Sequence, residues 1–144
     1  MMRTVLTSSL LVLCVAPAFA AGGETPAQTS LPGTTWALDC KSPASAINSH
    51  LTYSVAPNGH LVETLGTGEK GRPREIDNIQ VITKDWVLYT LHDTDGEAVN
   101  IVTFTAKDGR KKSWSSIGTN GKAYILSGKF PDGTGSPPWF EKCK

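Results

Sequence analysis

The 144-residue chain has few residues of the kinds that build metal centres and nucleophilic active sites. It contains only three histidines, and the spacings of His50, His60 and His92 match no compact zinc motif. A Gly-x-Ser-x-Gly elbow and a phosphate-cradling glycine motif are both missing. The acidic run at 93–97 has its glycine too early for a calcium loop, so we interpret it as a hairpin turn. The sequence therefore predicts no catalytic residue, no metal and no cofactor, and we expect that the protein is not an enzyme.

The chain also lacks an excess of either positive or negative charge. The chain has 14 Lys and Arg against 13 Asp and Glu, a formal net charge of +1. The run Arg110-Lys111-Lys112 precedes Trp114, and cations beside an aromatic side chain can bind single-stranded nucleic acid, an anionic surface or an acidic protein. A nucleic-acid-binding protein normally carries a strong basic excess. The balance of charge therefore predicts no nucleic-acid partner.

Long apolar runs are missing except at the N-terminus. Arg3 is followed by a largely apolar stretch at 5–15 and then by Ala18-Phe19-Ala20, a small-x-small cleavage signature. A membrane-spanning helix needs roughly 20 continuous apolar residues, and polar residues at 7–9 interrupt this stretch. We predict a signal peptide at 1–20, a periplasmic or secreted location and no stable membrane insertion.

Two alternatives bear on the segment that follows. Cys14 raises the possibility of a lipoprotein, but Leu13 is bulky where that processing favours a small residue. Residues 21–33 are small, polar or turn-forming and predict a flexible leader. The rest, 34–144, has a length that suits a single domain with one core.

Cysteine is scarce as well, and its number predicts one disulfide. Cleavage after residue 20 removes Cys14 and leaves Cys40 and Cys143, an even number in a compartment where disulfides form. The bond would close a loop of about 100 residues, for which chain entropy gives up to about 4.7 kcal/mol. Two free thiols are the alternative.

No segment of ten or more residues shows helical periodicity, and the sequence instead shows the pattern of strands. From Thr34 onward, short runs rich in β-branched and aromatic residues alternate with turns built from Gly, Asn, Asp or Pro. The predicted strands are 34–39, 51–56, 60–65, 76–83, 86–92, 97–106, 110–117 and 122–128. Consecutive hairpins favour an all-β fold, a small antiparallel up-and-down barrel of about eight strands, with a partly open β-sandwich as the alternative.

Two segments interrupt this pattern. Residues 66–75 contain three cations and two carboxylates and predict an irregular loop between two hairpins, where binding residues are often placed. The tail at 131–143 is rich in proline and therefore cannot form a central strand of a sheet. We expect this tail to cross the outside of the barrel and to bring Trp139 and Phe140 near the disulfide.

The start of the first predicted strand has a family resemblance. Leu31-Pro32-Gly33-Thr34-Thr35-Trp36 resembles the opening of lipocalin-type barrels, which begin with Gly-x-Trp; here one extra residue separates Gly33 from Trp36. The resemblance implies that Trp36 plugs one end of the barrel and that a cation from a late strand lies over its ring. Small exported barrels of this kind include ligand carriers and inhibitors of proteases or lysozyme.

Two functional hypotheses follow. In the first, the barrel binds a small apolar or amphipathic molecule. Its candidate binding residues are the interior aromatics Tyr53, Trp86, Tyr89, Trp114 and Tyr124, together with Arg72 and Arg74 of the loop at the mouth. In the second, the protein is an interaction module, either an inhibitor of an exported protease or lysozyme or a subunit of an envelope assembly. An internal cavity above roughly 300 Å³ would favour the first, and the sequence leaves the oligomeric state open.

Overall fold

The computed structural model describes residues 31–144, which form one antiparallel sheet of nine strands in the order β8-β7-β6-β5-β4-β3-β2-β1-β9. The predicted signal peptide and most of the predicted leader lie outside these residues. The strands are β1 (Thr34–Ala37), β2 (His50–Val55), β3 (Leu61–Gly66), β4 (Arg72–Thr83), β5 (Trp86–His92), β6 (Ala98–Thr105), β7 (Lys111–Gly118), β8 (Ala123–Ile125) and β9 (Glu141–Lys142). The predicted all-β antiparallel architecture is confirmed.

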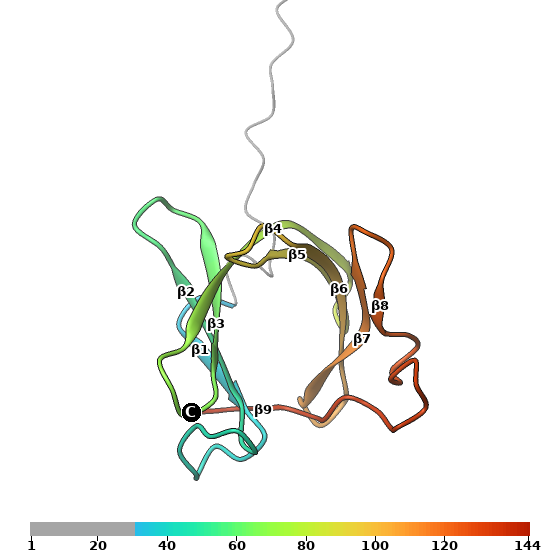
Figure 1. Cartoon of the computed structure of the whole chain (residues 1–144). Helices are drawn as coiled ribbons and strands as arrows, with labels where there is room; N and C mark the ends of the chain where they lie inside the picture. The colour runs from blue at the N-terminus through green and yellow to red at the C-terminus, as the bar shows by residue number, and fades with distance from the viewer. Residues whose placement is uncertain (1–30) are drawn as a thin grey trace, which may run out of the picture.

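Successive strands from β1 to β8 are neighbours in the sheet, so the chain forms a simple meander. Tight turns make this possible: Gly59 and Gly109 close the β2–β3 and β6–β7 turns at φ of 85° and 82°, values that cost a glycine little. Figure 1 shows the meander curling into a ring when it is viewed end-on. One face of the sheet is therefore concave and encloses the core.

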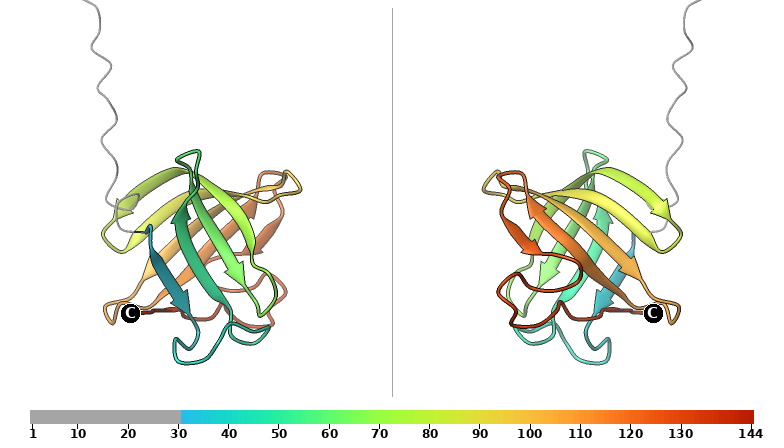
Figure 2. Two further views of the ribbon diagram at one scale, coloured as in Figure 1. Left: turned by 90° about the vertical axis from the view of Figure 1, so that its left-hand side faces the viewer. Right: turned by 90° about the vertical axis from the view of Figure 1, so that its right-hand side faces the viewer.

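The ring is not a continuous sheet, and a closed barrel is not shown. Its two edge strands are β8 and β9, and β9 comes from the proline-rich tail and pairs with β1. On the other side, Phe140 forms an isolated antiparallel bridge with Lys111 of β7, with backbone N–O distances of 2.8 and 2.9 Å. In both views of Figure 2 the tail runs along the lower end of the molecule, beside the ends of the strands.

The predicted loop at 66–75 is wrong in its second half. β4 begins at Arg72 and continues for 12 residues, so the connection after Gly66 is only five residues long, 67–71. Leu65 pairs with Arg72 and Glu63 pairs with Arg74. The charged residues and the proline indicated a loop. The segment forms a strand instead, because its backbone pairs with β3 and because Arg74 forms an ion pair with the buried Glu63.

The N-terminal boundary also differs from the sequence-based one. The predicted leader extends to residue 33, but Leu31 packs against the core and its carbonyl accepts a hydrogen bond from the backbone N–H of Thr34 at 3.1 Å. The backbone N–H of Gly33 donates to the carbonyl of Tyr53 at 2.8 Å. The folded part of the chain therefore includes at least Leu31–Gly33.

The predicted disulfide is confirmed. Cys40 and Cys143 are bonded, with their Cα atoms 5.4 Å apart and a sequence separation of 103 residues. The bond joins the segment after β1 to the segment after β9, next to the pairing of Trp36 with Lys142. It therefore fixes the tail on the edge of the sheet. In the part of the chain that the structure covers, no helix is long and apolar enough to cross a membrane.

Removing the disulfide tests how far the tail depends on it. We expect Cys143→Ser to lower the free energy of unfolding by about 2–5 kcal/mol, because the unfolded chain regains the entropy of a long loop. Thermal and urea denaturation of the oxidised protein measure this change, with the wild type under reducing conditions as a matched control. An unchanged melting temperature would show that β9 is held by its other contacts alone.

Candidate functional site

A buried carboxylate lies at the centre of the concave face. Glu63 of β3 is 2% exposed and receives the hydroxyl hydrogen bond of Tyr53 at 2.8 Å. The Tyr89 hydroxyl donates to the same oxygen at 3.4 Å, and the Arg74 guanidinium forms an ion pair with the other oxygen. Burial raises the pKa values of both tyrosine hydroxyls well above the usual value, so the hydroxyls stay neutral and donate hydrogen bonds. The carboxylate is therefore satisfied from three neighbouring strands.

Lys111 at the start of β7 extends this network toward the first strand. Its Nζ donates to the Tyr53 hydroxyl at 2.8 Å and lies 4.4 Å from the centre of the Trp36 ring and 4.2 Å from that of Tyr53. Burial lowers the pKa of Lys111 to about 7, although the negative charge of Glu63 acts in the opposite direction. A cation from a late strand thus lies over Trp36, which is the contact that the lipocalin-type resemblance implies.

This network includes two of the residues that the first hypothesis assigned to a ligand. Tyr53 is 1% exposed and Tyr89 is 4% exposed, and both are committed to Glu63. They pack with Trp36, Leu61 and other apolar residues in one cluster. Both residues are core side chains in this structure.

Trp86 and Trp114 lie on the opposite, outer face of the sheet. Successive side chains of a strand alternate between faces, and Val87 packs against the core beside Trp86. The two indole rings meet edge to face at 5.3 Å, in contact with Phe104 rather than with the core cluster. The register of β5 and β7 thus turns both residues outward, away from the interior that the first hypothesis assigned to them.

The three other candidates line two hollows that have Arg74 in common. Arg72 and Arg74 line a hollow of about 290 Å³ beside the β3–β4 loop, and Arg74 and Tyr124 line a neighbouring one of about 250 Å³. Arg72 pairs with Asp93 at 3.5 Å, and the Tyr124 hydroxyl donates to Glu97 at 2.6 Å. The first hollow is close to the lower limit of roughly 300 Å³ for small-molecule sites, and the second lies below it.

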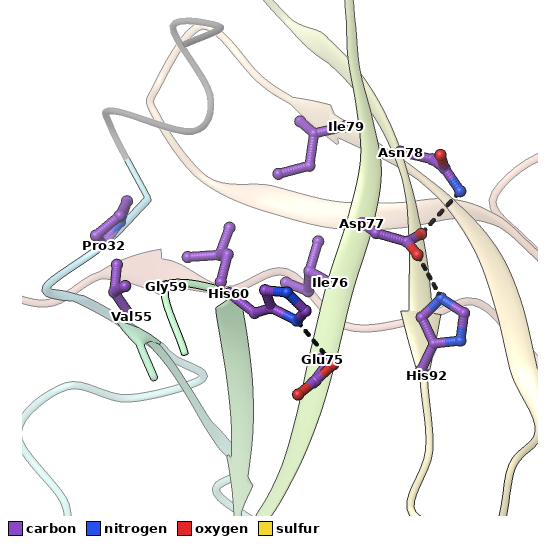
Figure 3. A pocket seen from close by; sticks show the side chains of 11 residues that line it. Pro32, Val55, Gly59, His60, Glu75, Ile76, Asp77, Asn78, Ile79 and His92 are labelled. Carbon is purple, nitrogen blue, oxygen red and sulfur yellow. Dashed lines mark hydrogen bonds and ion pairs between the residues drawn. The ribbon is translucent and has the colours of Figure 1, made fainter. Parts of the chain in front are cut away.

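A larger hollow, of about 410 Å³, lies between the β2–β3 hairpin and β4. We call it the β4 hollow. Figure 3 shows Pro32 and Val55 on one side of it and Ile76 and Ile79 on the other, with His60 between them. Its full lining is Pro32, Val55, Gly59, His60, Leu61, Glu75, Ile76, Asp77, Asn78, Ile79 and His92. The lining is thus apolar over part of its surface and polar over the rest.

The polar part is built from two imidazole–carboxylate pairs on adjacent strands. His60 Nδ1 lies 3.1 Å from Glu75 Oε2, and His92 Nε2 lies 2.9 Å from Asp77 Oδ2. Glu75 and His92 are register partners on β4 and β5, so the two pairs form one row. The hydrogen bond from His60 lowers the pKa of Glu75. Within residues 31–144 no group of three or more His, Cys, Asp or Glu is arranged to hold a metal ion.

A β-bulge in β4 shapes the hollow. Asp77 pairs with Thr90 and Gln80 with Leu88, so two residues, Asn78 and Ile79, face the single residue between them on β5. Asn78 has φ of 50°, a left-handed conformation that asparagine tolerates better than most residues. A bulge redirects the side chains around it, and here Ile79 packs against the core while it lines the hollow.

The sequence did not indicate the β4 hollow. In the sequence its histidines suggest at most metal ligands, and its apolar residues fit ordinary strand positions. Asn78 inside a β-branched run is the one sequence signal for the bulge. Comparison with protein-family models, with curated proteins and with solved structures found no match to this chain.

The buried carboxylate gives a stability test. We expect Glu63→Gln to lower the free energy of unfolding by about 3–5 kcal/mol, because Arg74 is left as an uncompensated charge in a mostly buried place. Urea denaturation measures the change. Glu75→Gln is the matched control, since that carboxylate pairs with His60 in solvent and we expect only a small effect. Equal midpoints for the two variants would contradict this account of Glu63.

Lys111 gives a test by pH. Its pKa is about 7 in the folded protein against an ordinary 10.5, so between these values the unfolded chain binds more protons. Stability therefore rises with pH in this window, and we expect the free energy of unfolding to increase by about 2 kcal/mol from pH 7 to pH 9. Urea denaturation at each pH measures it. Lys111→Met should remove the increase, and an equal slope in the variant would show that other groups cause it.

Proposed function

We propose that the protein is an exported binding protein that holds a small amphipathic molecule in the β4 hollow. The observation that carries the proposal is the lining of this hollow. At about 410 Å³ it falls within the range of roughly 300–1,000 Å³ of small-molecule sites. Apolar and polar side chains are segregated around it, as an amphipathic ligand requires. The ligand class is that of the first sequence-based hypothesis, but the site is moved from the interior to the wall of the sheet.

The lining suggests how such a ligand would lie. An apolar group would pack against Leu61, Ile76 and Ile79, which continue the core of the protein. A hydroxyl or amine would exchange hydrogen bonds with the His60–Glu75 pair at the rim. Because imidazole offers a donor or an acceptor and carboxylate only acceptors, the rim can serve either kind of group. Val55 is 56% exposed and is the apolar residue a ligand would meet first.

Three observations support the finer parts of the proposal. The Cys40–Cys143 bond is typical of an oxidising compartment, which supports export to the periplasm or beyond. The pairing of β9 with β1 and the bridge from Phe140 to Lys111 support a small barrel that the tail completes. The position of Lys111 over Trp36 supports the resemblance to lipocalin-type proteins.

A fluorescent probe tests the site. N-phenyl-1-naphthylamine is a neutral aromatic amine that brightens in apolar surroundings, and a molecule of its size is expected to bind with a Kd on the order of 10–100 µM. Val55→Trp places a large side chain at the edge of the hollow, and we expect about tenfold weaker binding. Ile82→Trp introduces the same side chain at a position of β4 that is 59% exposed and does not line the hollow, and should leave binding unchanged.

The two variants decide between the outcomes. Fluorescence titration that shows weaker binding only for Val55→Trp places the probe in the β4 hollow. If neither variant changes the affinity, or if the wild type gives no enhancement at millimolar probe, the hollow is not a binding site and the proposed function fails. Melting temperatures of both variants confirm that each has folded.

A further inference from the structure

The outer surface of β5, β6 and β7 carries an aromatic cluster that the proposed ligand site does not use. Trp86 and Phe104 are register partners with ring centres 4.7 Å apart, and Trp114 meets Trp86 edge to face at 5.3 Å. Trp139 of the tail joins them 6.1 Å from Phe104. All four side chains are only partly buried. We call these four residues the aromatic face.

Two cations lie on the aromatic face. Lys112 Nζ is 4.9 Å from the centre of the Trp139 ring and 5.7 Å from that of Trp114. The Arg110 guanidinium lies 5.6 Å from the Trp139 ring, and it pairs with Asp108 at 2.8 Å. Within residues 31–144, Lys112 has no ion-pair partner. Its charge is held in place by indole rings and is available to a carboxylate from outside.

The positive charge of the chain is concentrated here. Residues 107–112, Lys-Asp-Gly-Arg-Lys-Lys, contain four cations and one acid, a net charge of +3, whereas the whole chain has +1 and its remainder therefore −2. Lys111 points into the core, so the outward cations of this hairpin are Lys107, Arg110 and Lys112. Such asymmetry favours an acidic partner and steers its approach.

The arrangement of the rings decides which acidic partner fits. Nucleic-acid bases and sugar rings stack on open aromatic faces. Here the ring of Trp139 is covered by two cations, and the other rings meet one another at close range. What remains for a partner is ring edges surrounded by cations. Trp and Arg at the centre of a patch, with charge at its rim, are typical of protein–protein binding sites.

We propose that the aromatic face docks an acidic protein segment, with carboxylates of the partner on Lys112 and Arg110 and its apolar side chains against the indole edges. The site is independent of the β4 hollow, because the two share no residue. Occupation of the two sites can therefore be measured separately.

The probe for this site is a fluorescein-labelled peptide that alternates Asp or Glu with Leu or Phe, compared with a peptide in which Lys replaces every acid. Fluorescence anisotropy at low salt should show binding of the acidic peptide only, and added salt should weaken it. We expect the double variant R110Q/K112Q to bind it at least about tenfold more weakly. Lys70→Gln, a matched loss of an exposed lysine on the β3–β4 loop, should bind as the wild type does.

Carbodiimide coupling of the bound peptide, followed by mass spectrometry, locates it. Coupling confined to Lys107 and Lys112 supports the proposal. Coupling spread over all exposed lysines, equal affinity of R110Q/K112Q and wild type, or equal binding of the basic peptide would overturn it. So would displacement of the peptide by an oligothymidylate or by polygalacturonate at lower concentration, because the partner would then be a nucleic acid or an anionic polysaccharide.

Discussion

A single buried carboxylate sets the constraints on this fold. Glu63 is enclosed by the sheet, and an isolated carboxylate in such a place is costly unless its oxygens are paired. Tyr53, Tyr89 and Arg74 meet this requirement from three different strands, and the Lys111 Nζ donates a further hydrogen bond to Tyr53. The register of β2 to β5 must therefore be kept, since a slip of one residue would turn these side chains to the opposite face. The centre of the concave face is consequently occupied by the side chains of this network.

The tail and the disulfide follow from the same constraint. Lys111 lies at the start of β7, which the short strand β8 does not reach, and there the tail pairs with β7 through Phe140. Phe140 bonds to the backbone of Lys111, β9 pairs with β1, and Cys143 fixes the end of the chain to Cys40. The same tail brings Trp139 to Phe104 and to Lys112 of β7. The position of the tail thus has two results: it covers the core, and it completes the outer aromatic face.

Much of the fold could be predicted from the sequence, because its strands are short, β-branched and separated by glycine turns. The disulfide could be predicted because only two cysteines remain after the predicted signal peptide. Glu63 could have been recognised: with Leu61 and Leu65 at two-residue spacing, it occupies an inward position. Its partner Arg74 could not be recognised, because one proline and five charged residues made 69–75 resemble a loop. The strand register decides on which face of the sheet Trp86 and Trp114 lie. The sequence leaves this register undetermined, because β5 has apolar residues on both sides. The β4 hollow depends on the bulge at Asn78, a tertiary feature with little sequence signal.

Native mass spectrometry of the protein purified from an exporting bacterial host tests the central claim, that the β4 hollow holds a small molecule, most directly. The account predicts a second mass, larger than that of the oxidised chain by the mass of one small compound, which collisional activation removes. It also predicts that Val55→Trp, purified in the same way, shows much less of this species. A bare mass for the wild type under gentle conditions, or an adduct that persists equally in the variant, would contradict it.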